Sequence, residues 1–422
     1  MNWFLLKNSL LVGTAATLLA MGLGIAGALW VTCLSKRWRG VILSMAVIAA
    51  VLPPFLVTNC WLHFFGFTGV WKKWLPLDLF SLGGTIWVLS LLLWPIPLLA
   101  AWSAWQRLEP AQLETDMAVT GWSLIRGLLL PVARAALAQA GVLIFVLALN
   151  NFAVPSILQV KVSPAEMWIR FNTEFDTPGV LQLCWPLVIL PLMLVAWFRR
   201  SGVPWPHRQL HAPARLVRQQ LGPAWFWTSG SITLLVCFLS VGMPLLQLVT
   251  TPRTWTELPG ALAAGQGACW NSFFLAALSA TVVTAAGVTA RRQSERAREG
   301  RLWSWVRTTV MAVLWLPFLL PGVLIGIGLI AVFNRPGLSF FYQSAGIVVL
   351  AFLVRYLGFG WTTLGQVTKT ADPALSDAAR LEGASRWQLF RFVQWPQLGS
   401  QIAAAWYVVF LLCLWDVESM IE

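Results

Sequence analysis

The sequence contains few charged residues for its length. Asp, Glu, Lys and Arg together make up 11% of the 422 residues, whereas 58% of the residues are hydrophobic. A soluble globular domain carries roughly 25% charged residues. A chain this apolar cannot hide its side chains in one water-facing core, so lipid must be the solvent for much of it. Because lipid cannot satisfy open backbone groups, we expect an all-α fold, a polytopic bundle of membrane-spanning helices.

Residues that could form a catalytic or metal centre are also few, and their spacing does not match known sites. The three His (His63, His207 and His211) form no ligand spacing with the six Cys, and no C-x-x-C occurs. We therefore predict no metal site and no cofactor, and we expect the cysteines to be small buried apolar residues. The sequence has neither a nucleophile elbow nor a G-x-x-x-x-G-K-[ST] segment, so it is predicted to hold no ATP and to be no enzyme.

The net charge of +13 comes from Lys and Arg in short loops between apolar runs. Nucleic-acid binding would need a basic face on a folded domain, which the sequence lacks, so we predict no nucleic-acid partner. Loops rich in Lys and Arg alternate with poorer ones, and the positive-inside rule places the rich loops in the cytoplasm. Both termini are then expected to face outward.

About ten apolar segments are long enough to cross a membrane, at roughly 20 residues each. The second is the least secure, because Pro53 and Pro54 interrupt its helical pattern. The first is too long for the apolar region of a signal peptide, and we interpret it as a retained span. The expected spans lie near 9–34, 41–60, 82–105, 134–158, 179–198, 225–249, 270–290, 307–333, 343–363 and 398–420.

The two halves of the sequence match each other at an offset of about 263 residues. One offset shared by several helices and a loop predicts a parallel duplication, and transporters commonly place the transport path between such repeats. We expect a first transmembrane half over 1–200, a basic cytoplasmic linker over 201–224, and a second half over 225–422 that is incomplete at its C-terminus. The matching segments are Asn8–Leu11 with Asn271–Phe274, Gly24 with Gly287, Pro54–Leu56 with Pro317–Leu319, and Pro131 with Pro396.

The most specific segment is a loop that reads DAARLEG over 377–383 and is followed, thirteen residues after its glycine, by Pro396. Small Ala378 and Ala379 let a helix pack closely against a partner, and Gly383 permits the backbone conformation that ends a short helix. The loop resembles the E-A-A-x-x-x-G loop of ABC importer permeases, in which a short helix docks in a groove of the ATPase subunit. It departs from that pattern in Asp377, which replaces the leading Glu, and in Trp395, which replaces the Leu before the proline.

The resemblance covers essentially the whole chain and is closest to the fused, two-half permeases of the ferric iron and thiamine type, which usually have twelve spans. It implies the transmembrane subunit of an ATP-driven importer in the bacterial inner membrane, moving a small solute delivered by an extracytoplasmic binding protein. The other implied partners are two copies of a cytoplasmic ATPase. The ATPase-coupling residues that it implies in the second half are Asp377, Ala378, Ala379, Leu381, Gly383 and Pro396.

The first half carries a weaker copy of this loop. Glu114 begins it, charged Asp116 replaces an Ala, and Gly121 precedes Pro131 by only ten residues. These residues are further coupling candidates, and the differences predict that the two loops couple unequally to the ATPase.

Four polar residues fall in matching spans, Asn150 and Asn151 in the first half and Asp416 and Glu418 in the second. Because such groups are expensive in a membrane, they tend to line a pathway or to pair internally. They either flank the translocation path or sit near water at the outer end of their helices. Arg355 is either a counter-ion for these acids or a side chain that reaches toward an interface.

Two other functions stay open at this point. An ion-gradient-driven secondary transporter would move its cargo without an ATPase. A truncated, inactive permease would follow if one helix were missing at each end. The sequence does not identify the cargo.

Overall fold

The computed structural model describes residues 3–74, 77–106, 108, 110, 113, 119–174, 179, 184–190, 192–193, 213–296, 310, 313–367 and 372–416. The regular structure in these ranges is helical throughout. The chain divides into two compact units, one of Met1–Val203 with Arg208–Leu258 and one of Pro204–His207 with Pro259–Glu422.

In the described ranges, seven helices are long and apolar enough to cross a membrane, or nine if each of two bent helix pairs is one span. The chain is therefore an all-helical polytopic membrane protein, as expected. Nine of the predicted spans coincide with these helices and bent pairs. The predicted span at 179–198 lies largely outside the described residues.

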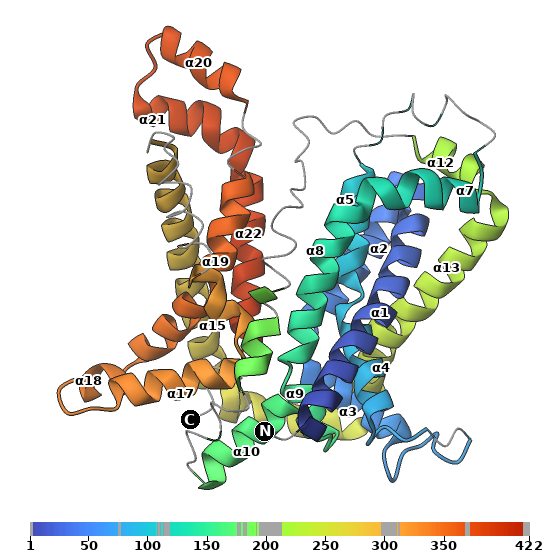
Figure 1. The fold of residues 1–422 in the computed structure, drawn as a ribbon, viewed down its shortest axis with the longest axis vertical. Helices are drawn as coiled ribbons and strands as arrows, with labels where there is room; N and C mark the ends of the chain where they lie inside the picture. The colour runs from blue at the N-terminus through green and yellow to red at the C-terminus, as the bar shows by residue number, and fades with distance from the viewer. Residues whose placement is uncertain are drawn as a thin grey trace. The chain divides into compact units, whose positions relative to one another are not determined.

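The first unit is built around its N-terminal helix (Figure 1). α1 packs along α4, α5, α8 and α13. Short α7 and α12 lie at one end of this unit, and α3, α9 and α10 lie at the other. The helices in chain order are α1 (Trp3–Cys33), α2 (Lys36–Val51), α3 (Pro54–Phe65), α4 (Leu82–Leu93), α5 (Pro95–Trp105), α7 (Trp122–Leu124), η1 (Ile125–Leu129), α8 (Leu130–Leu149), α9 (Ala153–Ile157), α10 (Ser163–Glu174), α12 (Ala214–Leu221), α13 (Pro223–Cys237), η2 (Phe238–Gly242) and α14 (Met243–Thr250).

Small residues let α1 approach its neighbours closely. A Cβ atom added to Gly24 would lie 2.4 Å from Pro97 Cγ and 2.6 Å from the Trp94 carbonyl oxygen. Helices in membranes associate through such small residues, because lipid leaves no hydrophobic force to drive them together. The crossing of α1 and α5 therefore depends on this glycine.

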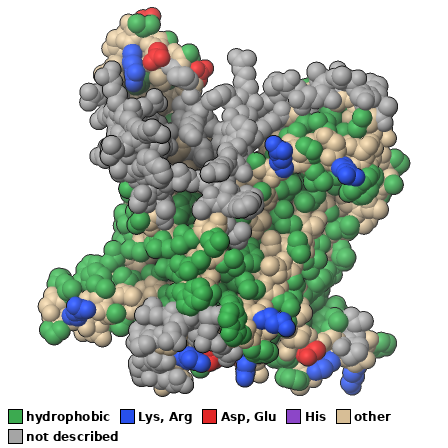
Figure 2. All heavy atoms as spheres, in the orientation of Figure 1, with side chains coloured by type: hydrophobic (Ala, Val, Ile, Leu, Met, Phe, Trp, Pro, Cys, Tyr) green, Lys and Arg blue, Asp and Glu red, His purple; other side chains and the backbone are tan. Residues whose placement is uncertain are grey.

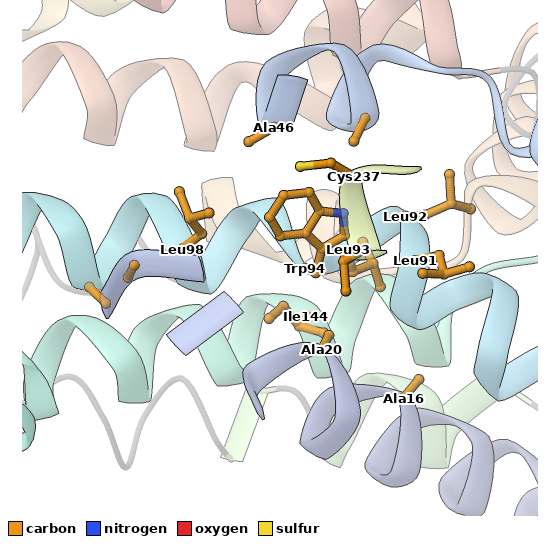
Figure 3. Close-up of a cluster of buried hydrophobic side chains, with 14 of the residues drawn as sticks. Ala16, Ala20, Ala46, Leu91, Leu92, Leu93, Trp94, Leu98, Ile144 and Cys237 are labelled. Atoms are coloured by element: carbon orange, nitrogen blue, oxygen red, sulfur yellow. The ribbon is translucent and has the colours of Figure 1, made fainter. Parts of the chain in front are cut away.

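Trp94 lies at the centre of the first unit's core. Figure 3 shows its ring among Ala20, Ala46, Ile144 and Cys237, which come from four different helices. The indole is fully buried, and its N–H donates to the Ser240 hydroxyl at 3.2 Å. A buried indole N–H needs such a partner, so this bond fixes the register of α13 and η2 against α5.

The helix pairs bend at prolines. α2 and α3 meet at 93°, and Pro53 is the extended residue before α3, as the sequence predicts. In the second unit, Val313–Leu319 and α17 meet at 114°, and Pro321 has the same extended conformation. The pairing of Pro54 with Pro317 was wrong in this respect, because Pro54 begins the helix after its break whereas Pro317 lies before the other break.

The second unit contains most of α15 and all later helices. α19 packs along α22, and α20 packs against η4. α20 and α21 lie at one end of this unit and α18 at the other (Figure 1). Its helices are α15 (Pro252–Arg296), α17 (Gly322–Phe333), α18 (Ser339–Tyr342), α19 (Ala345–Val367), α20 (Pro373–Leu381), α21 (Arg386–Gln388), η4 (Leu389–Gln394) and α22 (Trp395–Trp415).

Large apolar side chains are exposed along the helices. On the face in Figure 2, hydrophobic side chains run over the helices of the first unit, and Lys and Arg lie toward the helix ends. Leu18, Leu235 and Phe238 are each at least half exposed. On a soluble monomer, a large contiguous patch of exposed apolar side chains would mark an interaction surface. Here they are the surface that a membrane covers.

Candidate functional site

α20 begins with a capped and anchored N-terminus. The Asp372 carboxylate accepts the Ala374 N–H at 2.9 Å, and Pro373 occupies the first helical position. An acidic cap and a proline at this position both favour helix initiation. The Asp372 N–H donates to Gln397 Oε1 at 2.9 Å, which ties the start of α20 to α22.

Gly383 closes the end of α20, two residues after Leu381, as the sequence predicts. Gly383 has a φ of +80°, and its N–H donates to the Arg380 carbonyl at 3.0 Å. The Ala384 N–H donates to the Ala379 carbonyl, also at 3.0 Å. These two bonds form a Schellman motif, which requires a left-handed residue at its glycine. No atom lies within 4 Å of a Cβ at Gly383, so the backbone conformation and not space demands the glycine.

The apolar side chains of α20 point away from the second unit. Leu381 is 89% exposed and Leu375 is 53% exposed. Ala378 is exposed and Ala379 is half-buried. Asp377 forms an exposed ion pair with Arg380 at 3.5 Å, which contributes little to stability. α20 thus presents two leucines and a small-residue face at a polar end of the unit.

A π-helix joins this loop to its membrane span. η4 runs into α22, and Pro396 is the second residue of α22. The first unit repeats this joint, because η1 runs into α8 and Pro131 is the second residue of α8. Proline lacks the N–H of a regular helical turn, and a widened π turn accommodates the loss.

The first loop is held by the linker. Gly121 has a φ of +57°, and its N–H donates to the Gln220 carbonyl of α12 at 2.8 Å. Trp122 stacks on Trp225 with ring centroids 5.7 Å apart. Glu114 lies outside the described residues. The described part of the first loop is therefore packed beneath α12 and α13, unlike Gly383.

The helix in the linker was missed from sequence, although a local signal was present. Val217 and Leu221 stand four residues apart and are buried, whereas Arg215 and Arg218 are exposed. This spacing is that of a short amphipathic helix. The Arg218 guanidinium lies over the Phe226 ring at 4.1 Å, which fastens α12 to α13.

Of the four polar residues in the spans, the structure describes three. Asn150 is buried at the C-cap of α8, and Asp416 is buried at the C-cap of α22. The Asn151 side-chain oxygen accepts the Val154 N–H at 3.0 Å, at the start of α9. Glu418 lies outside the described residues. Asn150 and Asp416 therefore occupy the same position in their helices, one in each unit.

Asp416 pairs with Arg355. Arg355 Nη1 lies 2.6 Å from Asp416 Oδ1, and the two side chains are 12% and 1% exposed. The Tyr356 hydroxyl lies 3.0 Å from Asp416 Oδ2 and 3.2 Å from the Leu412 carbonyl, two alternative acceptors for its single proton. Of the two interpretations of Arg355, the structure thus bears out the counter-ion. We call Arg355, Tyr356 and Asp416 the Asp416 cluster.

Metal ligands do not gather among the residues that the structure describes, where no three His, Cys, Asp or Glu could share one ion. Five of the six cysteines are buried, and Cys269 is exposed.

Comparison with known proteins identifies the class of this architecture. Residues 284–414, which run from within α15 to within α22, match the family described as binding-protein-dependent transport system inner membrane component. The Fe(3+)-transport system permease protein FbpB 2 of Haemophilus influenzae is 23% identical over 431 residues, which cover 96% of this chain and 78% of that protein.

Other permeases match shorter parts of the chain. The maltose/maltodextrin transport system permease protein MalG of Escherichia coli is 29% identical over 151 residues, 35% of this chain and 49% of MalG. The inner membrane ABC transporter permease protein YcjO of the same organism is 34% identical over 83 residues, 20% of this chain and 26% of YcjO. No solved structure matches. Residues 284–414 thus belong to the binding-protein-dependent transport inner membrane components, the non-catalytic, multi-pass permeases of ABC transporters, and the chain is similar to one such permease over 96% of its length.

Proposed function

We propose that this chain is the transmembrane subunit of an ATP-driven importer and that α20 is its principal ATPase-docking helix. The exposure of Leu381 and Leu375 on a short helix that Gly383 closes carries this proposal. A helix with an apolar exposed face binds in a groove of a partner. η4 and α22 continue directly from this loop into the membrane, so a displacement of α20 reaches the transmembrane bundle.

Two homologous halves with ten spans in all form part of the proposal, with boundaries at 1–200, 201–224 and 225–422. The joints of η1 with α8 and of η4 with α22 support it, as do one proline-broken pair in each unit and the C-caps Asn150 and Asp416. A further joint of this kind, of η2 with α14, lies in the first unit. α13 falls in the second half by sequence, although it packs against α1 of the first unit. Rocking of the halves would open a central site to each side in turn.

The family implies an ATPase and a binding protein as partners in general. We propose that two ATPase copies bind, one at each loop, and that the α20 loop transmits most of the coupling. The difference between the loops supports this, since Gly121 is packed beneath α12 and Trp225 whereas Gly383 has open space around it.

We propose a small solute as cargo, with ferric iron as the first candidate. Its support is the full-length likeness to a permease named for Fe(3+) transport. Because Arg355 pairs with Asp416, the Asp416 carboxylate is not an argument for a cationic cargo. Radiolabelled ferric iron and radiolabelled thiamine, each with its loaded binding protein, distinguish the two cargo types in vesicles.

The docking role of α20 predicts the effect of a charge at its tip. Leu381→Glu is expected to weaken retention of the ATPase on the purified chain by at least about tenfold, as expected for a central interface residue. Phe340→Glu is the matched control, because Phe340 is 75% exposed on α18 at the other end of the unit.

The measurement is the ATPase co-purified per chain at increasing salt. Equal retention by Leu381→Glu and the control would remove α20 from the interface. A purified chain that moves cargo on an ion gradient without ATPase would favour a secondary transporter instead.

A further inference from the structure

The far end of α22 is fastened to the middle of α19 by the Asp416 cluster. Asp416 is the C-cap residue of α22, its Oδ1 pairs with Arg355, and its Oδ2 lies 3.0 Å from the Tyr356 hydroxyl. Buried charges in low dielectric stay together, because separating them leaves each one unpaired. Moving the ends of α19 and α22 apart at this contact would therefore leave a buried charge without its partner.

The bundle architecture does not require this charge pair. In the first unit, Asn150 occupies the C-cap that Asp416 occupies in the second. At the repeat offset, Arg355 and Tyr356 correspond to Leu92 and Leu93, which are both buried in the core. Only the half with the exposed docking helix therefore places an ion pair at this joint, among the described residues.

The two ends of α22 are both fixed to other elements. At its start, Gln397 accepts the Asp372 N–H of the docking loop, and η4 continues into it without a break. At its end, the Asp416 cluster joins it to α19. α22 thus connects the docking loop mechanically to α19 across the membrane.

We propose that Arg355 and Tyr356 are positioning residues of the transport cycle, which keep α19 and α22 moving as one body when the ATPase displaces α20. This inference rests on the proposed function. In this proposal the Asp416 cluster stays closed throughout the transport cycle. The alternative is a contact that must open in each cycle. A covalent crosslink between α19 and α22 distinguishes the two, because it would block transport only if the contact must open.

The test uses Arg355→Cys/Asp416→Cys in a chain whose six native cysteines are replaced by alanine. The complex with its ATPase is reconstituted in vesicles, and a short bifunctional thiosulfonate forms one disulfide with each cysteine, releasing two sulfinates. Uptake of radiolabelled ferric iron from its binding protein is measured per ATP hydrolysed. The cysteine-free parent is the control for folding, ATPase binding and cargo.

Without the bridge, ATPase activity is expected to stay near that of the parent while uptake per ATP falls about tenfold, a size typical of lost coupling. Bridging is expected to restore uptake per ATP, and reduction of the disulfides to abolish it again. Tyr356→Phe, which keeps the ion pair and the ring, is expected to lower uptake per ATP by a smaller factor.

Three results would contradict the proposal. The first is uptake per ATP in the unbridged variant equal to that of the parent. The others are a bridge that stops uptake and a bridge that does not restore uptake per ATP. If the double cysteine variant does not fold, unchanged uptake per ATP in Tyr356→Phe argues against the proposal. If the parent itself shows no ATP-dependent uptake, the proposed function or cargo has failed and not the link.

Discussion

Replacing Gly383 with valine is expected to lower cargo-stimulated ATPase activity of the assembled transporter about tenfold, within the range of coupling between sites. Gly383 has a φ of +80°, and a side chain in that conformation costs about 1–3 kcal/mol. The strain is relieved by unwinding the last turn of α20, since that turn is exposed and its end is closed by backbone bonds from Glu382, Gly383 and Ala384. The docking helix then loses its shape while the bundle stays folded.

Gly121→Val is the comparison, and its effect is expected to fall on stability. A Cβ on Gly121 would lie 3.4 Å from the Trp225 ring, and the residue's N–H is bonded to α12. Valine there disturbs the packing of the linker on the first unit. The melting temperature of the purified chain is therefore expected to drop more for Gly121→Val than for Gly383→Val.

ATPase stimulation per folded chain distinguishes the two loops. It is expected to fall further in Gly383→Val than in Gly121→Val, after correction for the fraction of folded protein. Equal losses in the two variants would show that both loops couple alike and that α12 does not restrain the first.

Local chemistry made the docking loop predictable. A glycine after a short amphipathic segment demands one backbone conformation, and Gly383 adopts it. The break at Pro53 followed in the same way from the missing N–H of proline. Such features depend on residues within one or two helical turns, so they can be predicted from the local sequence.

Contacts between distant segments could not be predicted in this way. Gly121 bonds to Gln220 almost a hundred residues later, and no pattern around either residue requires the other. Arg355 was expected either to pair or to reach an interface, and the choice depends on the register of α19 against α22. That register is set by packing along both helices, which cannot be predicted from a single sequence. The mismatch between Pro54 and Pro317 has the same cause, because the two segments were matched by residue type without knowing where each helix breaks.

Gly24→Ala is expected to destabilise the first unit by about 3 kcal/mol or more, the upper end of the cost of overpacking. The added Cβ would lie 2.4 Å from Pro97 Cγ, 2.6 Å from the Trp94 oxygen and 2.8 Å from the Leu98 nitrogen. Two of these are backbone atoms and the third belongs to a rigid ring, so α1 and α5 must move apart. That movement opens the core around Trp94. The melting temperature in detergent and the yield of monodisperse protein measure the loss.

Gly22 provides a matched control on the same helix. No atom lies within 4 Å of a Cβ there, and alanine in place of a helical glycine gains up to about 1 kcal/mol. Gly22→Ala is therefore expected to be neutral or stabilising. Gly287, the counterpart of Gly24 in the second unit, approaches the Leu364 side chain at 2.6 Å and the Gly360 oxygen at 3.3 Å. Because a leucine methyl rotates away more easily than backbone moves, Gly287→Ala is expected to cost less than Gly24→Ala. A Gly24→Ala chain as stable as Gly22→Ala would contradict the close crossing of α1 and α5, and a larger loss in Gly287→Ala would contradict the difference between the units.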